Sequence, residues 1–239
     1  MDTPILSRRD RYRTATREEA KGIALRQLAE GGTGALSLNA IGKEMGITGP
    51  ALYRYFASRD ALLTELIIDA YGDFAAAVET VVQAGDNAAY LRALAAAIRA
   101  WALAQPHRYL LLYGTPVPGY VAPEGTVPLA RRILAPFLAA LAVLPSPADA
   151  TDTQLAVLDA QFTAAARNSD HQIPGALMRR GVVWWTRMHG LLSLEIEGHF
   201  VGMGFDPALL YDVEVAALLA NGGTADRAAV NETDAVRPS

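Results

Sequence analysis

The stretch from Ser37 to Phe56, SLNAIGKEMGITGPALYRYF, constrains the fold of this chain more than any other. In its first half, apolar residues recur at helical spacing: Leu38, Ile41 and Met45. Gly46 can adopt a positive φ without steric cost, as a sharp turn requires. Thr48 is a favourable N-cap, and Pro50 falls in the first helical turn, where its missing N–H is not needed. The stretch predicts two helices that cross steeply over a short turn, the geometry of a helix-turn-helix that reads DNA.

The second of these helices is predicted to have a buried side and an exposed side. Leu52 and Phe56 lie at helical spacing and are expected to return the helix to the core. The residues left to face outward or sideways are Gly49, Pro50, Ala51, Tyr53, Arg54 and Tyr55. Small residues would let the helix N-terminus enter the major groove, while tyrosine hydroxyls and an arginine reach phosphates and base edges. The alternative is a helical hairpin that only packs, because aromatic residues at helical spacing often belong to a core.

The rest of the chain is also helical in pattern. No segment alternates with period two over β-branched residues, so we predict an all-α protein of nine or ten helices. Thr16 and Glu19 form a capping box that would start the first helix, which ends at Gly31 and Gly32. A long late helix is expected from Gly175 to Gly204.

Charge and composition divide the chain into parts. Residues 1–60 hold 10 Lys/Arg against 7 Asp/Glu, whereas residues 61–239 hold 11 against 18. A basic head on an acidic body is typical of a nucleic-acid binder with a second function. We therefore predict a DNA-binding domain over 1–60, with the helix-turn-helix at about 37–56, and a helical body over 61–220. Residues 221–239 have lost their apolar residues and are expected to be a disordered tail.

Several classes of protein are disfavoured by composition. The chain has no Cys, which excludes disulfides, thiolate nucleophiles and Cys-based metal sites. The N-terminus lacks the apolar core of a signal peptide. The longest apolar run, Ile133 to Leu144, has 12 residues and is too short to span a bilayer. We expect a soluble, cytoplasmic protein.

Residues 13–63 resemble the DNA-binding head of the TetR family of bacterial transcription regulators. The resemblance rests on Leu36-Ser-Leu with Ile41, Gly46-Ile-Thr, Ala51-Leu-Tyr-Arg-Tyr-Phe and Ser58-Arg-Asp-Ala-Leu-Leu. The residues that match the family's DNA-contacting positions are Thr48, Gly49, Pro50 and Ala51 at the groove, Tyr53, Tyr55 and Arg59 at phosphates, and Arg54 at a position that varies between members. Where the family usually has Ala, this chain has Gly42.

Two further features could contact DNA. Ser37 caps the second helix, whose N-terminus is expected to face a phosphate. An N-terminal arm carries Arg8, Arg9, Arg11 and Arg13, and it either reaches DNA or is a solvated tail.

The segment from Val183 to Gly198 resembles the WHG-type C-terminal domain of TetR-like proteins through Trp185, His189 and Gly190. The resemblance implies a helical domain for ligand binding and dimerisation. This segment is apolar on most of its circumference and must be buried on two sides, one of which would face a second subunit. The predicted homodimer interface includes Leu191, Leu194 and Phe200.

Aromatic and sulfur-containing side chains of the body could form an apolar ligand site. They are Trp101, Tyr109, Tyr113, Phe137, Phe162, Trp184 and Met188. Each taken alone is more often plain core, and it is the set that indicates a ligand site. Because these helices carry few charges, the ligand is expected to be apolar or aromatic. His189 could bind the ligand, sense pH or be a core histidine.

No catalytic grouping, metal site or cofactor-binding loop is found in the sequence, so we expect neither an enzyme nor a cofactor. The prediction is a dimeric repressor that leaves a palindromic operator when a small molecule binds. The alternatives are an activator of the same family, a helical small-molecule-binding protein whose head no longer binds DNA, and an enzyme that kept the fold.

Overall fold

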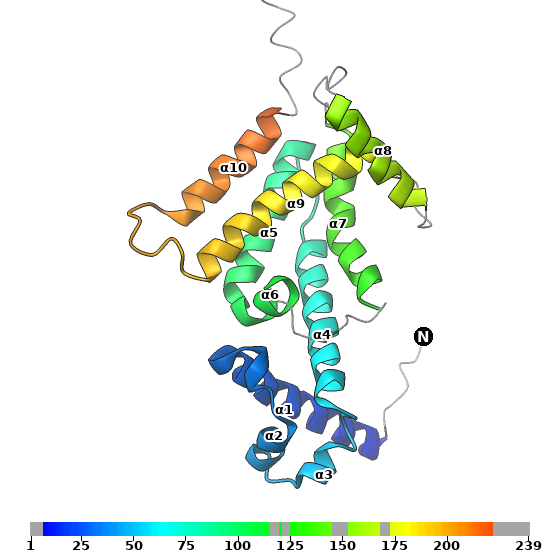
Figure 1. Cartoon of the computed structure of the whole chain (residues 1–239), viewed down its shortest axis with the longest axis vertical. Coiled ribbons are helices and arrows are strands. Elements are labelled where there is room, and N and C mark those ends of the chain that lie inside the picture. Colours follow the sequence, from blue (N-terminus) through cyan, green and yellow to red (C-terminus); the bar gives the residue numbers. More distant parts are fainter. Residues whose placement is uncertain (1–6, 115–119, 121–124, 145–152, 168–172, 222–239) are drawn as a thin grey trace, which may run out of the picture. The chain divides into compact units, whose positions relative to one another are not determined.

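The computed structural model describes residues 7–114, 120, 125–144, 153–167 and 173–221. Within these residues the chain forms ten α-helices and one short 3-10 helix, without any strand, which confirms the predicted all-α fold (Figure 1). The helices are α1 (Arg8–Gly31), η1 (Thr33–Ala35), α2 (Leu38–Glu44), α3 (Gly49–Leu52), α4 (Arg59–Glu79), α5 (Asn87–Ala104), α6 (Pro106–Tyr113), α7 (Thr126–Ala142), α8 (Thr153–Arg167), α9 (Gly175–Ile196) and α10 (Pro207–Asn221). None of the helices in this part of the chain is both long and apolar enough to cross a membrane.

The chain divides into two compact units. The first contains residues 1–73 and 105–129, and the second contains residues 74–104 and 130–239. Helix α4 begins in the first unit and ends in the second. The predicted functional boundary at residue 60 stays a prediction, and the predicted tail beyond Asn221 lies outside the described residues.

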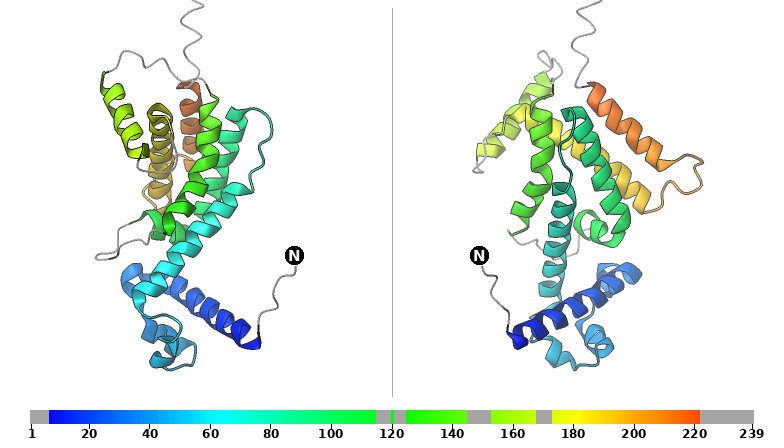
Figure 2. Two further views of the ribbon diagram at one scale, coloured as in Figure 1. Left: turned by 90° about the vertical axis from the view of Figure 1, so that its right-hand side faces the viewer. Right: turned by 180° about the vertical axis from the view of Figure 1, so that it is seen from behind.

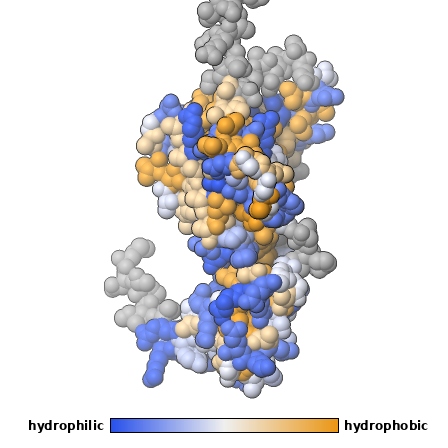
Figure 3. Space-filling model, turned by 90° about the vertical axis from the view of Figure 1, so that its left-hand side faces the viewer, coloured by the Kyte–Doolittle hydropathy of each residue, from blue (hydrophilic) through white to orange (hydrophobic). Residues whose placement is uncertain are grey.

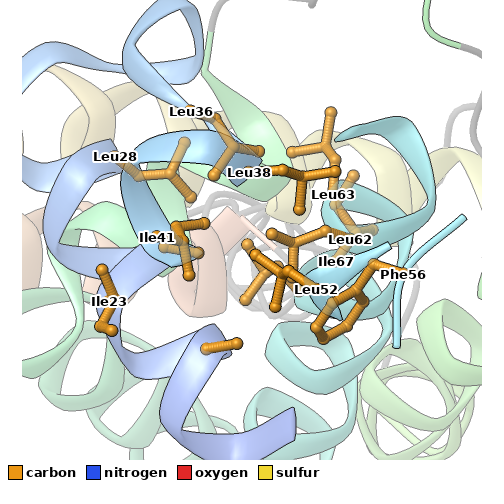
Figure 4. Packing of buried hydrophobic residues seen from close by; sticks show 13 residues of the cluster. Ile23, Leu28, Leu36, Leu38, Ile41, Leu52, Phe56, Leu62, Leu63 and Ile67 are labelled. Atoms are coloured by element: carbon orange, nitrogen blue, oxygen red, sulfur yellow. The ribbon is translucent and has the colours of Figure 1, made fainter. Parts of the chain in front are cut away.

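The first unit is built around one apolar cluster. Side chains from α1, α2, α3 and α4 meet in it, and Ile41, Leu52 and Leu62 have no exposed surface (Figure 4). Leu111 and Leu112 of α6 pack against the same cluster. This packing explains why α6, distant in sequence, belongs to the first unit.

Helix α9 lies at the centre of the second unit. Helices α8 and α10 lie on either side of it, as Figure 2 shows, and α5 contacts both α9 and α10. Gly175 allows α9 to approach α8 closely, since a Cβ there would lie 1.9 Å from the Asp159 carbonyl oxygen. The Tyr211 hydroxyl of α10 donates a hydrogen bond of 3.0 Å to the Ala95 carbonyl of α5. A bidentate ion pair joins Arg99 of α5 to Glu195 of α9.

Two predicted helix boundaries were wrong. The first helix starts at Arg8 instead of Thr16, because the Ser7 hydroxyl caps it by accepting the Asp10 N–H at 3.1 Å. Thr16 is inside α1, where its hydroxyl donates to the Tyr12 carbonyl. The late helix ends at Ile196, after which turns with three positive-φ glycines lead to α10: Gly198, Gly202 and Gly204.

The earlier start of α1 also changes the predicted N-terminal arm. Its four arginines are part of the first turns of α1 and are exposed there: Arg8, Arg9, Arg11 and Arg13.

Candidate nucleic-acid interface and ligand cavity

The turn between α2 and α3 is fixed by backbone hydrogen bonds. Ser37 caps α2, with its hydroxyl accepting the Ala40 N–H at 3.3 Å. Gly46 has a φ of 69°, and the next amide, that of Ile47, donates to the Gly42 carbonyl at 2.9 Å. A Cβ on Gly42 would lie 3.3 Å from the Ile47 carbonyl oxygen. The chain can therefore reverse sharply here, as the sequence predicted.

The segment after this turn has a buried side and an exposed side. Helix α3 is four residues long and continues as hydrogen-bonded turns to Phe56. Leu52 and Phe56 are 0% and 1% exposed and belong to the apolar cluster of the first unit. The predicted DNA-contacting residues of this segment divide by exposure: Thr48, Pro50, Tyr53 and Arg54 are exposed, whereas Gly49, Ala51 and Tyr55 are partly buried.

Gly49 has a steric reason to be glycine. A Cβ at this position would lie 2.8 Å from Asn39 Oδ1, so any larger residue would displace that side chain. Residues 48–54 thus form a surface of small residues followed by Tyr53 and Arg54. Such a surface can approach a nucleic acid closely and place a hydroxyl and a guanidinium against it.

Arg59, a predicted phosphate contact, makes bonds within the protein. Its Nε donates to the Leu36 carbonyl at 3.2 Å and its Nη2 donates to the Thr33 carbonyl. Its side chain is 35% exposed. Arg59 therefore ties the start of α4 to the segment that precedes the Ser37 cap.

The second unit contains an apolar cavity of about 60 Å³. Three of the predicted ligand-binding residues line it: Phe137, Trp184 and Met188. The other lining residues were not predicted: Ile98, Leu134, Leu138, Met178, Gly181, Val182 and Trp185. Every lining side chain is apolar or aromatic, and the polar groups among them are the indole N–H groups of the two tryptophans. This lining favours an uncharged, largely apolar molecule, and the cavity must widen to hold a drug-sized one, since pockets for such ligands measure about 300–1,000 Å³.

The structure places the other predicted ligand-binding residues elsewhere. Trp101 is stacked on Phe74, with ring centroids 4.4 Å apart. Tyr109 and Tyr113 are in the first unit, where Tyr113 also makes an edge contact with Tyr71. Burial, together with the two neighbouring tyrosines, raises the pKa of Tyr113 far above its usual range, so its phenol stays protonated. The remaining predicted residue, on α8, is Phe162, which is partly buried.

His189 lies beside Trp185, with ring centroids 3.9 Å apart. Burial lowers the pKa of His189 to about 3. The imidazole is therefore neutral near pH 7, which favours a core histidine over a pH sensor.

The predicted dimer residues differ in exposure. Leu194 is 43% exposed on α9, whereas Leu191 and Phe200 are partly buried, and the Phe200 ring is 5.2 Å from that of Phe205. Exposed hydrophobic residues continue on α10 with Leu209 and Val213. Figure 3, which faces the side on which α10 lies, shows hydrophobic side chains on the surface of the second unit.

In the described part of the chain, no group of three His, Cys, Asp or Glu residues could hold a metal ion.

Two family models match the sequence. A model of bacterial regulatory proteins of the tetR family matches residues 23–66, and a model of the tetracyclin repressor-like C-terminal domain matches residues 91–218. The matched regions include the helix-turn-helix and the cavity.

Known proteins resemble the chain over most of its length. It is 34% identical to the HTH-type transcriptional regulator Rv1816 of Mycobacterium tuberculosis in an alignment 215 residues long that covers 84% of this chain and 91% of that protein. The regulator Mb1846 of Mycobacterium bovis gives the same values. A solved structure of SCO4313 has a TM-score of 0.76 and 44% identity, covering 91% of this chain and 100% of that one. The TetR family regulator PfmR of Thermus thermophilus shares the fold at 17% identity, with a TM-score of 0.54 and coverage of 86% and 97%.

Proposed function

Because the chain belongs to the TetR family of DNA-binding transcription regulators, we propose that it is a cytoplasmic homodimeric repressor. It binds a palindromic operator and leaves it when a small apolar or aromatic molecule binds the second unit. The observation that carries the proposal is the exposure of Thr48, Pro50, Tyr53 and Arg54 on the side opposite the fully buried Leu52.

The proposed docking places α3 in the major groove. The exposed Thr48 and Pro50 and the small residues between α2 and Leu52 allow a close approach. Tyr53 and Tyr55 contact phosphates, as do the N–H groups of Arg59 that do not bond to the Leu36 and Thr33 carbonyls. The N-terminus of α2 behind Ser37 faces another phosphate. Arg54 reads a base edge, since guanidinium groups bind guanine in a bidentate manner.

Selection of bound sequences from a random pool of duplex DNA tests this docking. We expect a palindromic consensus and a steep fall in affinity with salt concentration. Repeating the selection with Arg54→Ala should abolish the preference at one position of each half-site, which would cost about 1–3 kcal/mol per contact. If the wild-type protein selects no sequence, this docking is wrong, and the alternative of a helical small-molecule-binding protein whose head no longer binds DNA is favoured.

Helices α9 and α10 supply the proposed dimer interface. Val183, Leu194, Leu209 and Val213 are all at least 40% exposed, and burying them against a second copy would remove apolar surface from water. Leu194→Glu should yield monomers in sedimentation and weaken operator binding. The control is Val143→Glu, which charges a residue directly after α7 that is 64% exposed. A wild-type protein that stays monomeric at micromolar concentration would refute the interface.

The apolar cavity is the proposed effector site. Helix α4 runs from the unit that contains the helix-turn-helix into the unit that contains the cavity, so a change at one end can reach the other along one helix. An effector releases DNA only if it binds the free protein more tightly than the DNA-bound protein. A 100-fold loss of DNA affinity corresponds to about 2.7 kcal/mol of coupling. Equal effector affinities measured with and without operator DNA would exclude an effector role. If the protein does not repress a reporter gene placed behind its operator, and loss of operator binding leaves expression no higher, an activator is favoured.

A further inference from the structure

Arg17 of α1 makes three contacts near the C-terminal end of the recognition segment, residues 48–56, which is proposed to read DNA. Its Nη1 donates to the carbonyl oxygen of Tyr55, and its Nη2 forms an ion pair with the Glu65 carboxylate of α4. Its Cζ lies 4.6 Å from the centroid of the Phe56 ring. One side chain of α1 thus joins both α4 and the last residues of the segment that follows α3.

The segment needs such a contact because α3 is short. Its four residues cannot form a stable helix alone, and the chain after Leu52 is held by turn bonds, such as that from the Tyr55 N–H to the Leu52 carbonyl at 2.9 Å. Carbonyl groups at a helix end lack partners within the helix. Arg17 supplies the donor for the Tyr55 carbonyl and so fixes the backbone that carries Tyr53 and Arg54.

The shape of an arginine side chain suits this set of contacts. The guanidinium is planar and has five N–H donors, so one edge can donate to a carbonyl while another pairs with a carboxylate. Its flat face can lie over the Phe56 ring at the same time. Lysine carries its three donors on one nitrogen, so it reaches two acceptors only where both lie around that single atom, and it has no flat face to lie over the Phe56 ring.

We propose that Arg17 is a positioning residue for sequence recognition and that Glu65 orients its guanidinium. The inference rests on the docking proposed above, in which residues 48–55 contact the operator. Arg17 makes no contact with DNA in this proposal. It holds the recognition segment at the angle at which Arg54 reaches a base edge. Losing Arg17 should therefore reduce the preference for the operator more than the affinity for DNA in general.

The experiment compares two probes, a duplex selected from a random pool by the wild-type protein and a random-sequence duplex of equal length. Arg17→Lys keeps the charge, and we expect it to lower affinity for the selected duplex by about 10-fold or more while the affinity for the random duplex changes by less than about 3-fold. Glu65→Gln is the sharper variant because it removes a negative charge from the DNA-binding unit. Charge alone would make both duplexes bind more tightly, whereas loss of positioning weakens binding of the selected duplex.

A neighbouring ion pair provides the matched control. Lys21 and Asp69 join the same two helices at 2.7 Å, each four residues further along the chain than Arg17 and Glu65. Lys21→Met and Asp69→Asn should leave the ratio of the two affinities at the wild-type value. Circular dichroism and urea unfolding of each variant confirm that the measured protein is folded.

Three outcomes would overturn the inference. An unchanged affinity ratio in folded Arg17→Lys and Glu65→Gln, with a wild-type protein that selects a clear consensus, would refute the role of Arg17 and leave the proposed function intact. An equal loss of the ratio in the Lys21 and Asp69 variants would show that any ion pair between α1 and α4 has this effect. A wild-type protein that selects no consensus would instead refute the proposed docking, and the inference with it.

Discussion

Burial of His189 predicts a measurable pH dependence of stability. An exposed histidine has a pKa of about 6.5, whereas burial lowers that of His189 to about 3. Since the folded-state pKa is depressed, the unfolded chain binds more protons than the folded chain between these two values. The free energy of unfolding should therefore fall as pH decreases from about 6.5 towards 3.

The size of the effect follows from the pKa difference. Each pH unit below 6.5 costs about 1.4 kcal/mol, so the contribution of His189 between pH 7.5 and pH 4.5 is roughly 2–3 kcal/mol. His189→Asn removes the titrating ring and should remove this part of the pH dependence. The variant will have its own lower stability at neutral pH, so the quantity to compare is the change with pH.

Urea unfolding followed by tryptophan fluorescence measures the free energy of unfolding of the second unit, which contains His189. All three tryptophans, Trp101, Trp184 and Trp185, belong to the second unit, which also contains His189. His199→Asn serves as the matched control, because the His199 side chain is 58% exposed. If His189→Asn and the wild-type protein lose the same free energy between pH 7.5 and pH 4.5, the imidazole is not held neutral by burial.

Three further variants test the turn, an ion pair and the cavity. Gly46→Ala should destabilise the helix-turn-helix by about 1 kcal/mol, because the φ of 69° at this position strains an alanine backbone. No atom lies within 4 Å of the added Cβ, so the cost is one of backbone strain alone. Faster hydrogen exchange of the α2 amides would report this destabilisation. Arg99→Ala should lower the free energy of urea unfolding by roughly 2–3 kcal/mol because it strands the mostly buried Glu195, and the added Glu195→Ala should recover part of the loss; no recovery would contradict the pairing. Gly181→Ala should alter stability by less than about 1 kcal/mol, since better helix propensity offsets the 2.6 Å approach to the flexible Leu138 side chain. It should also reduce the thermal shift caused by an effector, and an unchanged shift would argue against the cavity as the site.

The helix-turn-helix could be predicted because its rules are local. The Ser37 cap and the positive φ of Gly46 depend on neighbours within a few residues. The inward side of the segment after the turn follows from the spacing of Leu52 and Phe56, both of which are buried. Here the local signals and the tertiary packing favour the same structure.

The start of α1 could not be predicted from hydrophobic periodicity. Residues 8–15 are all exposed, so no apolar face marks the first two turns of this helix. The pattern of buried residues begins at Thr16, where a second capping sequence with Glu19 also occurs. The Ser7 cap extends the helix beyond the part that packs.

The cavity was only partly predictable because its walls come from distant segments. Ile98 and Trp184 are 86 positions apart, and which of their faces meet depends on how α5, α7 and α9 cross. Gly181 lines the cavity but carries no side chain that could mark it in the sequence. Composition likewise cannot tell whether an arginine faces solvent or bonds to carbonyl groups, as Arg59 does.

Helix α4 has contacts suited to a helix that transmits a signal. Four of its acidic residues pair with basic residues of other helices, in the pairs Glu65–Arg17, Asp69–Lys21, Asp73–Arg108 and Glu79–Arg132. The Asp69 and Asp73 side chains are 44% and 48% exposed, and exposed pairs of this kind contribute about 0–1 kcal/mol each. Ion pairs tolerate a small displacement of the helix better than close apolar packing does, because Coulomb energy varies slowly with distance. The proposed coupling of about 2.7 kcal/mol exceeds the cost of rearranging either of these two pairs. An effector in the cavity could therefore shift α4 without unfolding the first unit, provided that the cluster around Leu62 moves with the helix.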